Sequence, residues 1–343
     1  SFVYLMSTNN KRNLVAFWIF GLCNNYAYVV MLSAAVDIIH RQKGEDRPSS
    51  SNETQCIEGL DDRHCSAVST GAVLLADIIP MLLIKAAFPF FMQRVPFGFR
   101  HFAVCFVQTY SFLVVAFSKS IAMSLLGVVF ASMCTGLGEI TFLSLTSYFD
   151  KSTISAWSSG TGGAGVVGAF AYAALTEPSL AGFSPSTALL AMLLIPATFA
   201  IAYWMILVMP PTVYAPGLSP ASWIVPLRNE VPNEVDYQSM HDMSSSTTVA
   251  SDLRVVEMEL SNKAAEVDAV ILSRALTARE KLFLIKPLLK YMIPVGLVYM
   301  AEYTINQGVV QLIIFNCSRG FGLAIPSQYR WYQVLYQVGV FIS

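Results

Sequence analysis

The residues in this 343-residue chain that could do chemistry are acids, amides and a few cations inside long apolar runs. Glu139 is the clearest case, because it lies about two turns before the polar break from Tyr148 to Ser155, in a run that is otherwise apolar. An ionisable side chain in hydrocarbon costs at least about 2.5 kcal/mol on insertion scales, so it usually faces a bundle interior or a wet cavity. Glu139 is therefore a candidate functional residue.

Other polar residues recur inside the apolar runs, and we expect them to form a substrate or proton path. They are Asn24, Asn25, Asp77, Lys85, Glu302, Asn306, Gln307 and Arg330. Asp77 and Lys85 lie roughly 12 Å apart along a helix axis, too far for a direct pair. Lys85 could instead extend to the membrane interface. The amides could equally bond to another helix.

Patterns for enzyme chemistry are missing from the sequence. The four histidines lie in loops or at their edges and form no metal-ligand cluster, and no nucleophile elbow, kinase set or zinc motif occurs. The net charge of −1 gives no indication of nucleic-acid binding. We expect a carrier rather than a catalyst, with no cofactor and no metal.

A glycine-rich stretch follows the polar break and contains Gly160, Gly162, Gly163, Gly165 and Gly168. A nucleotide-binding loop would need a preceding strand and a phosphate-facing helix start, and neither is predicted here. Small residues instead recur four positions apart, a spacing that lets membrane helices approach backbone to backbone. The pattern favours close helix packing over a direct ligand role.

The composition indicates a polytopic membrane protein, since 55% of the residues are hydrophobic and only 13% are charged. We expect an all-α transmembrane helix bundle. The apolar runs predict six helices in residues 14–209 and two more afterwards, at about 14–39, 67–92, 102–117, 121–146, 157–175, 187–209, 290–315 and from 328. Six spans, a polar linker and further spans form the major facilitator layout. Residues 287–343 would then begin a second half.

The polar segments between spans carry possible modification sites. The loop 40–66 contains a glycosylation acceptor at Asn52, and a second acceptor begins at Asn316. Cys56 and Cys65 of the same loop could form a disulfide in an oxidising lumen or remain free thiols. Helix parity puts both acceptors on one side, predicted to be lumenal. The excess of Lys and Arg in the opposite short loops predicts a cytosolic segment 1–13.

A long polar stretch, 210–286, is predicted to be a cytosolic linker. Its first part is rich in Pro and Ser, which favours disorder, and an apolar stripe over 253–276 predicts an amphipathic helix. Tyr237 to Met240 has the form of a tyrosine-based sorting signal, and Ile271-Leu272 is close to an acidic dileucine signal, although such short patterns also arise by chance. The linker is thus a candidate binding site for cytosolic trafficking proteins.

Several stretches together resemble the battenin family of lysosomal or vacuolar membrane proteins. They are FLSLTSYFDKSTISAWSSGTGGAG, FGLCNNYAYVVMLSAAVDI from Phe20, VSTGAVLLADIIP from Val68, AEYTINQG from Ala301 and QYRWYQVLYQVGVF from Gln328. The resemblance implies a lysosomal or late-endosomal membrane location and a distant major-facilitator-like fold. It also implies further helices after residue 343, so we expect the chain to be truncated within its second half.

The resemblance implies efflux of glycerophosphodiesters, the soluble products of phospholipid breakdown. Such an anionic or zwitterionic substrate needs a cation, and Arg330 and Lys85 are available. Glu139 and Glu302 would repel it if ionised, so we assign them to proton coupling or to pairing with a basic residue. Transport of basic amino acids with control of lumenal pH is an alternative. A trafficking scaffold in endosome–lysosome traffic and autophagy is another.

Overall fold

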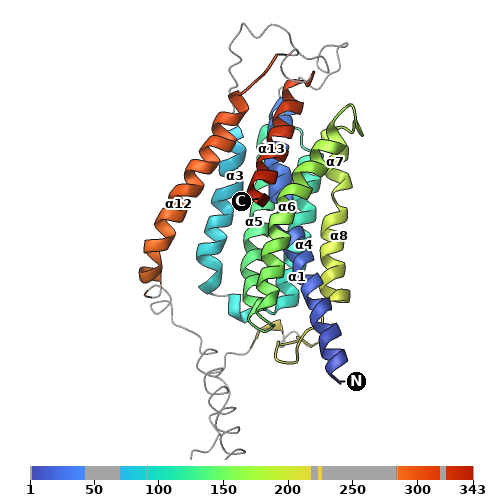
Figure 1. The fold of residues 1–343 in the computed structure, drawn as a ribbon, viewed down its shortest axis with the longest axis vertical. Coiled ribbons are helices and arrows are strands. Elements are labelled where there is room, and N and C mark those ends of the chain that lie inside the picture. Colours follow the sequence, from blue (N-terminus) through green and yellow to red (C-terminus); the bar gives the residue numbers. More distant parts are fainter. Residues whose placement is uncertain are drawn as a thin grey trace, which may run out of the picture.

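The chain forms a bundle of helices, seen in a computed structural model that describes residues 2–42, 70–90, 92–217, 223–225, 283, 285–316 and 322–342. No strand occurs among these residues (Figure 1). Five of their helical segments are long and apolar enough to cross a membrane: Asn9–Ser33, Thr70–Phe90, Phe97–Ala116, Ile121–Thr146 and Pro185–Ile206. The predicted all-α membrane bundle is confirmed.

The first half of the bundle contains long helices at the positions that the apolar runs predicted, together with shorter ones. They are α1 (Phe2–Ser33), α2 (Ala35–Gln42), α3 (Thr70–Ala87), α4 (Phe97–Ala116), α5 (Ile121–Thr146), α6 (Ser152–Thr176), α7 (Pro185–Ala191) and α8 (Leu194–Ile201). Local signals fix several starts. The Ser120 side chain accepts from the Met123 N–H before α5, and Ser184 caps α7 ahead of Pro185. The single helix predicted over 187–209 is instead divided into α7, α8 and the π-helix η3 (Ala202–Ile206).

Glycines bring α1 and α6 together. A Cβ atom on Gly160 would lie 2.0 Å from the Trp18 carbonyl oxygen, and one on Gly21 would lie 2.2 Å from the Trp157 carbonyl oxygen. Only glycine fits at such distances, because the two backbones themselves are in contact. The prediction of close packing in the glycine-rich stretch is confirmed: Gly160 meets α1, and a Cβ on Gly165 would lie 2.2 Å from the Gln337 Oε1 of α13.

Aromatic side chains fill the core around His101. This histidine is fully buried in α4, where it stacks on Tyr203 with ring centroids 4.3 Å apart. The prediction that all four histidines lie in or beside loops was therefore wrong for His101. Helix α4 begins five residues earlier than expected, which draws the residue into the bundle.

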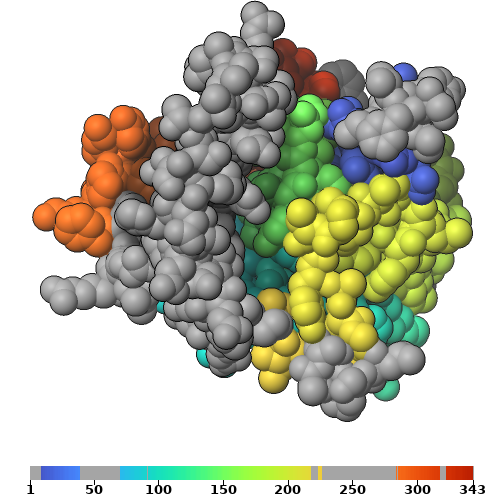
Figure 2. All heavy atoms as spheres, turned by 90° about the horizontal axis from the view of Figure 1, so that it is seen from below, coloured from blue at the N-terminus to red at the C-terminus, as the bar shows by residue number. Residues whose placement is uncertain are grey.

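The second half begins with η7 (Lys286–Leu288), α12 (Leu289–Tyr303), η8 (Thr304–Val309) and η9 (Val310–Leu312), and continues with α13 (Ile325–Ile342). Helix α13 packs along α6 (Figure 1). Helix α12 buries no residue, whereas η8 at its end buries Asn306 and Gln307. Figure 2 shows α12 in orange at the edge of the molecule opposite the yellow residues that follow α8. The described parts of the two halves thus meet through α13 and η8.

Candidate functional site

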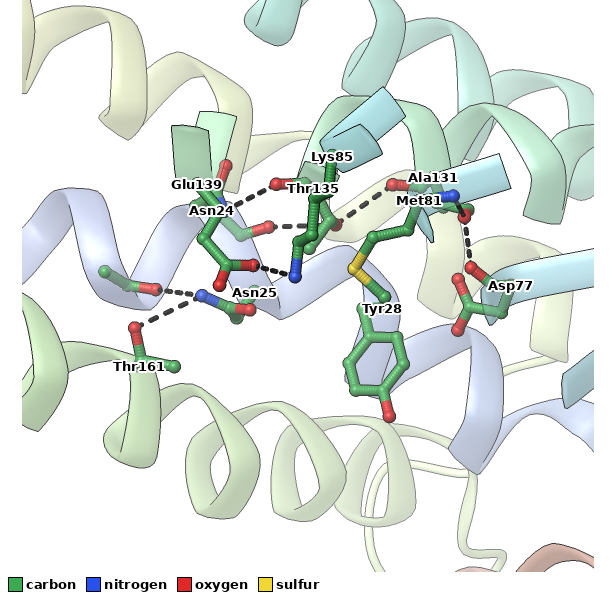
Figure 3. A network of polar contacts seen from close by, with 12 residues as sticks. Asn24, Asn25, Tyr28, Asp77, Met81, Lys85, Ala131, Thr135, Glu139 and Thr161 are labelled. Carbon is green, nitrogen blue, oxygen red and sulfur yellow. Dashed lines mark hydrogen bonds and ion pairs between the residues drawn. The ribbon is translucent and has the colours of Figure 1, made fainter. Parts of the chain in front are cut away.

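Lys85 and Glu139 form an ion pair between α3 and α5 (Figure 3). The Lys85 Nζ lies 2.6 Å from the Glu139 Oε2, and the two side chains are 35% and 31% exposed. The expected pairing of Glu139 with a basic residue is present. Lys85 therefore has a charged partner on the neighbouring helix, and its extension to the membrane interface stays a prediction. Both charges remain accessible from outside the helix pair.

Asn24 connects α1 to α5 next to this pair. Its Nδ2 donates to the Thr135 carbonyl oxygen at 3.1 Å, and the Thr135 hydroxyl donates to the Asn24 carbonyl oxygen at 3.2 Å. Gly138 makes room for the amide, since a Cβ there would lie 1.8 Å from the Asn24 Oδ1. Asn24 is fully buried. Its contacts are those of a residue that bonds one membrane helix to another.

Asn25 points from α1 toward α6. Its Nδ2 donates to the Thr161 hydroxyl oxygen at 3.2 Å and to the Gly21 carbonyl oxygen at 3.2 Å. The side chain is only partly buried, and Figure 3 shows it bonded to Thr161 in the same region as Lys85 and Glu139. An amide and a hydroxyl with remaining hydrogen-bonding capacity therefore accompany the ion pair. Thr161 was not among the predicted site residues.

Asp77 belongs to the same network but lies deeper. It is fully buried in α3. Neither carboxyl oxygen has a hydrogen-bond partner among the described residues. The predicted absence of a direct contact with Lys85 agrees with the geometry, in which Lys85 is taken by Glu139.

A second set of polar residues lies between η8 and α13. Glu302 accepts a hydrogen bond from the Tyr336 hydroxyl. Asn306 and Gln307 each donate to the Gln333 Oε1 at 3.3 Å. Glu302 and Asn306 line a cavity of about 320 Å³ together with Tyr332 and Tyr336. Glu302 and Asn306, both expected on the substrate or proton path, thus face the same cavity.

Glu302 and Glu139 do not meet in one site, contrary to the expectation of a single cavity bordered by their helices. The reason is that α12 buries no residue along its length, so Glu302 turns toward α13. The Tyr28 hydroxyl of α1 hydrogen-bonds the Tyr303 hydroxyl of α12 and so connects the two sets. Tyr28 lies in the network of Figure 3.

Arg330 forms a third set, at the end of the bundle where α1 ends and α13 begins. Its Nη1 donates to both carboxylate oxygens of Asp37 at 3.0 Å, and its Nη2 lies 3.9 Å from the Glu177 Oε2. Ser327 accepts from Nη2 at 2.8 Å, and the Tyr172 hydroxyl donates to Asp37 at 2.9 Å. The guanidinium is thus enclosed by first-half acids.

The expectation that Arg330 is available to a substrate anion does not fit the structure. Arg330 is only 6% exposed and its charge is matched by Asp37 and Glu177. Neither acid was among the predicted site residues. Helix parity offered a signal, because the ends of the first and fifth predicted spans and the start of the eighth fall on one side of a membrane. Gln307 supports the same region by accepting from the Tyr329 hydroxyl at 2.7 Å.

The structure describes only some of the remaining predicted site residues. Asn316 follows η9 and is partly buried. The other residues lie outside the described part of the chain: Asn52, Cys56, Cys65, Tyr237, Met240, Ile271 and Leu272, with nearly all of the polar linker and its predicted amphipathic helix. These assignments stay predictions.

The bundle and its interior charges define a polytopic, all-helical membrane protein. A crystal structure of a peptide transporter, POT, in complex with sulfate matches 96% of this chain and 66% of that chain, with a TM-score of 0.52 and 10% identity. Such a likeness concerns the fold alone. The chain belongs to the battenin family: the family model described as CLN3 protein matches residues 15–343.

Sequence matches to individual relatives extend along nearly the whole chain. Battenin of Canis lupus familiaris is 39% identical over 341 residues, covering 97% of this chain and 68% of the relative. Protein btn-1 of Neurospora crassa is 35% identical over 350 residues, covering 99% and 68%. The chain therefore spans about two thirds of the length of these relatives, and the resemblance to the battenin family is confirmed.

Proposed function

We propose that this chain acts in a lysosomal or late-endosomal membrane carrier for small anionic or zwitterionic phosphodiesters, with its N-terminus in the cytosol. Family membership and the transporter-like fold support a carrier. The substrate class and the location come from the family resemblance. Lys85 would bind the phosphodiester, and Asn25 with Thr161 would contact its hydroxyl groups.

The observation that carries this proposal is the accessibility of the Lys85–Glu139 pair, whose side chains are 35% and 31% exposed. A phosphodiester bears one negative charge, as a carboxylate does. It can therefore replace Glu139 at the ammonium group without changing the charge balance around Lys85. Glu139 is then released to take a proton or to face a cationic group of a zwitterionic substrate.

Arg330 takes no part in this scheme, because its charge already faces Asp37 and Glu177. In the proposed carrier these residues hold the first and second halves together at one end of the bundle. Asp37, Tyr172 and Glu177 belong to the first half, and Arg330 belongs to α13. A carrier that rocks its halves around a central site needs such contacts to form and break.

The test is uptake of labelled glycerophosphocholine by the protein reconstituted in liposomes. Lys85→Gln should lower the uptake rate at least tenfold, about 1.4 kcal/mol of lost substrate binding, because the phosphate loses its cation. Lys85→Arg should retain more of the rate, since it keeps the charge. Lys290→Gln is the matched control, because Lys290 lies exposed on α12. Equal uptake by Lys85→Gln and wild type would contradict the proposal.

The same liposomes distinguish the alternatives. Uptake of labelled lysine without uptake of the phosphodiester would favour transport of basic amino acids. A trafficking scaffold makes a different prediction, because its function would depend on the polar linker. Deleting residues 240–251 should leave the flux of a carrier unchanged, whereas a scaffold should lose its cytosolic partners.

A further inference from the structure

Asp77 differs from other acids in the bundle interior because no described residue balances its charge. Its side chain is fully buried, and both carboxyl oxygens lack a hydrogen-bond partner among the described residues. Other interior acids have partners: Asp37 has Arg330, Glu139 has Lys85 and Glu302 has Tyr336. An ionised carboxylate in a dry interior without a partner is strongly disfavoured. The packed arrangement therefore suits a neutral acid.

The groups that face Asp77 supply no positive charge. The ionisable side chains around it are Tyr28 of α1, Cys134 of α5 and Tyr303 of α12. These are neutral groups at physiological pH. Lys85, on the same helix, is engaged by Glu139. Ionisation of Asp77 would consequently require water or a cation that the present packing does not bring to it.

The backbone hydrogen bonding of α3, the helix that carries Asp77, is interrupted in the turn that follows Asp77. Pro80 has no N–H to donate within α3. The Met81 N–H donates to the Ser132 hydroxyl oxygen at 2.9 Å, and that hydroxyl donates to the Asp77 carbonyl oxygen. A side chain of α5 thus bridges the two ends of one helical hydrogen bond. A proline and an inserted side chain are both recognised causes of helix bending.

We propose that Asp77 is a proton-binding site that controls how α3 packs against α1 and α5. With the proton bound, the carboxyl stays buried beside Tyr28. When the proton leaves, the carboxylate needs water, and α3 opens at the Pro80 turn to admit it. Lys85 lies on the other side of this turn, so the opening also alters the Lys85–Glu139 pair. Coupling of the proton to transport rests on the proposed function, whereas proton binding does not.

The test is infrared spectroscopy of the purified protein in lipid at neutral pH. A protonated carboxyl without hydrogen bonds gives a carbonyl stretch that is separate from those of carboxylates and amides. We expect this band in the wild type, its loss in Asp77→Asn, and its retention in Asp150→Asn, where the acid is exposed in a turn. Identical spectra of wild type and Asp77→Asn in this region would overturn the proposal.

Asparagine resembles the neutral acid, so Asp77→Asn should unfold at the same temperature as the wild type at neutral pH. Should that variant fail to fold, Asp77→Glu is the substitute: it should shift the band, and an unshifted band would overturn the assignment. In liposomes, Asp77→Asn should make substrate flux independent of a pH gradient. If the wild type shows the band and the flux through Asp77→Asn still follows the pH gradient, coupling is rejected but the proton site is not. A wild type without flux would reject the proposed function alone.

Discussion

Two ion pairs of the bundle, Lys85–Glu139 and Arg330–Asp37, use the same chemistry in opposite surroundings. Lys85 and Glu139 lie within the first half and are 35% and 31% exposed. Arg330 and Asp37 join the two halves and their side chains are 8% and 7% exposed. An accessible pair contributes up to about 1 kcal/mol and exchanges partners easily. Removing one member of a buried pair costs about 3–5 kcal/mol, because the other charge stays unpaired.

The difference in exposure indicates different roles for the two pairs. The accessible pair suits exchange with a ligand, and the buried pair suits a structural contact between the two halves. Arg330 also donates to the Ser327 hydroxyl oxygen, and Asp37 also accepts from the Tyr172 hydroxyl. These two bonds satisfy part of the hydrogen-bonding capacity that the buried pair leaves over. In the accessible pair Lys85 and Glu139 bond to each other, and Asn25 with Thr161 forms a separate hydrogen bond in the same region. Substitutions in the two regions should therefore change different properties, stability in one and transport in the other.

Arg330→Leu should have the largest effect on stability. Asp37 and Glu177 would remain buried without a cation, and the free energy of unfolding should fall by about 3–5 kcal/mol. Chemical denaturation in detergent measures this change. The double variant Arg330→Leu/Asp37→Asn should recover part of the loss, because it removes one of the unpaired charges. A loss below about 1 kcal/mol would mean that the buried pair behaves like an exposed one.

Gly160→Ala should have the next largest effect, because the contact between α1 and α6 supports both regions. The new Cβ would lie 2.0 Å from the Trp18 carbonyl oxygen. The two helices must move apart, at a cost of about 1–3 kcal/mol in the free energy of unfolding. Gly162→Ala is the control, since its nearest neighbour outside the helix backbone is a Phe341 side-chain atom at 3.8 Å. Equal unfolding curves for the two variants would contradict the close contact.

Lys85→Gln should change stability least among the ion-pair variants. The pair is partly exposed, so the free energy of unfolding should fall by less than about 1 kcal/mol, measured by denaturation in the same detergent. The exchanged pair Lys85→Glu/Glu139→Lys should restore that stability while it reverses the position of the charges. A stability loss as large as that of Arg330→Leu would remove the distinction between the two regions.

The sequence predicted the helices well because each span needs a long apolar run, and it marked Glu139, Lys85 and Arg330 because charges inside such runs are rare. It did not predict the partners. Arg330 and Asp37 are 293 residues apart, and their contact depends on how α13 packs against α1 and α6. The π-helix η8 also depends on packing, since Asn306 and Gln307 both reach Gln333 there. Apolar runs fix where helices lie along the chain, whereas side-chain contacts between distant helices need the assembled bundle.

Asp150 lies in the turn between α5 and α6, where hydrogen bonds rather than an ion pair hold its carboxylate. Its substitution should have the smallest effect on stability. Its Oδ1 accepts from the Ser152 N–H at 2.9 Å and from the Ser152 hydroxyl at 2.7 Å. These bonds favour the ionised form and lower the pKa of Asp150 below its ordinary value of 3.8. NMR of the Asp150 carboxyl should therefore show a midpoint below 3.8.

Because the pKa of Asp150 is depressed in the folded chain, its stabilising contribution is present above the unfolded pKa and is lost as the pH falls through the folded one. Ser152→Ala removes the hydroxyl donor and should move the midpoint up toward 3.8, without restoring it fully because the backbone N–H remains. An unchanged midpoint would show that the hydroxyl has no effect on the acid. Asp150 is fully exposed and has no ion pair with another described residue, so its loss should leave the unfolding curve at neutral pH almost unchanged.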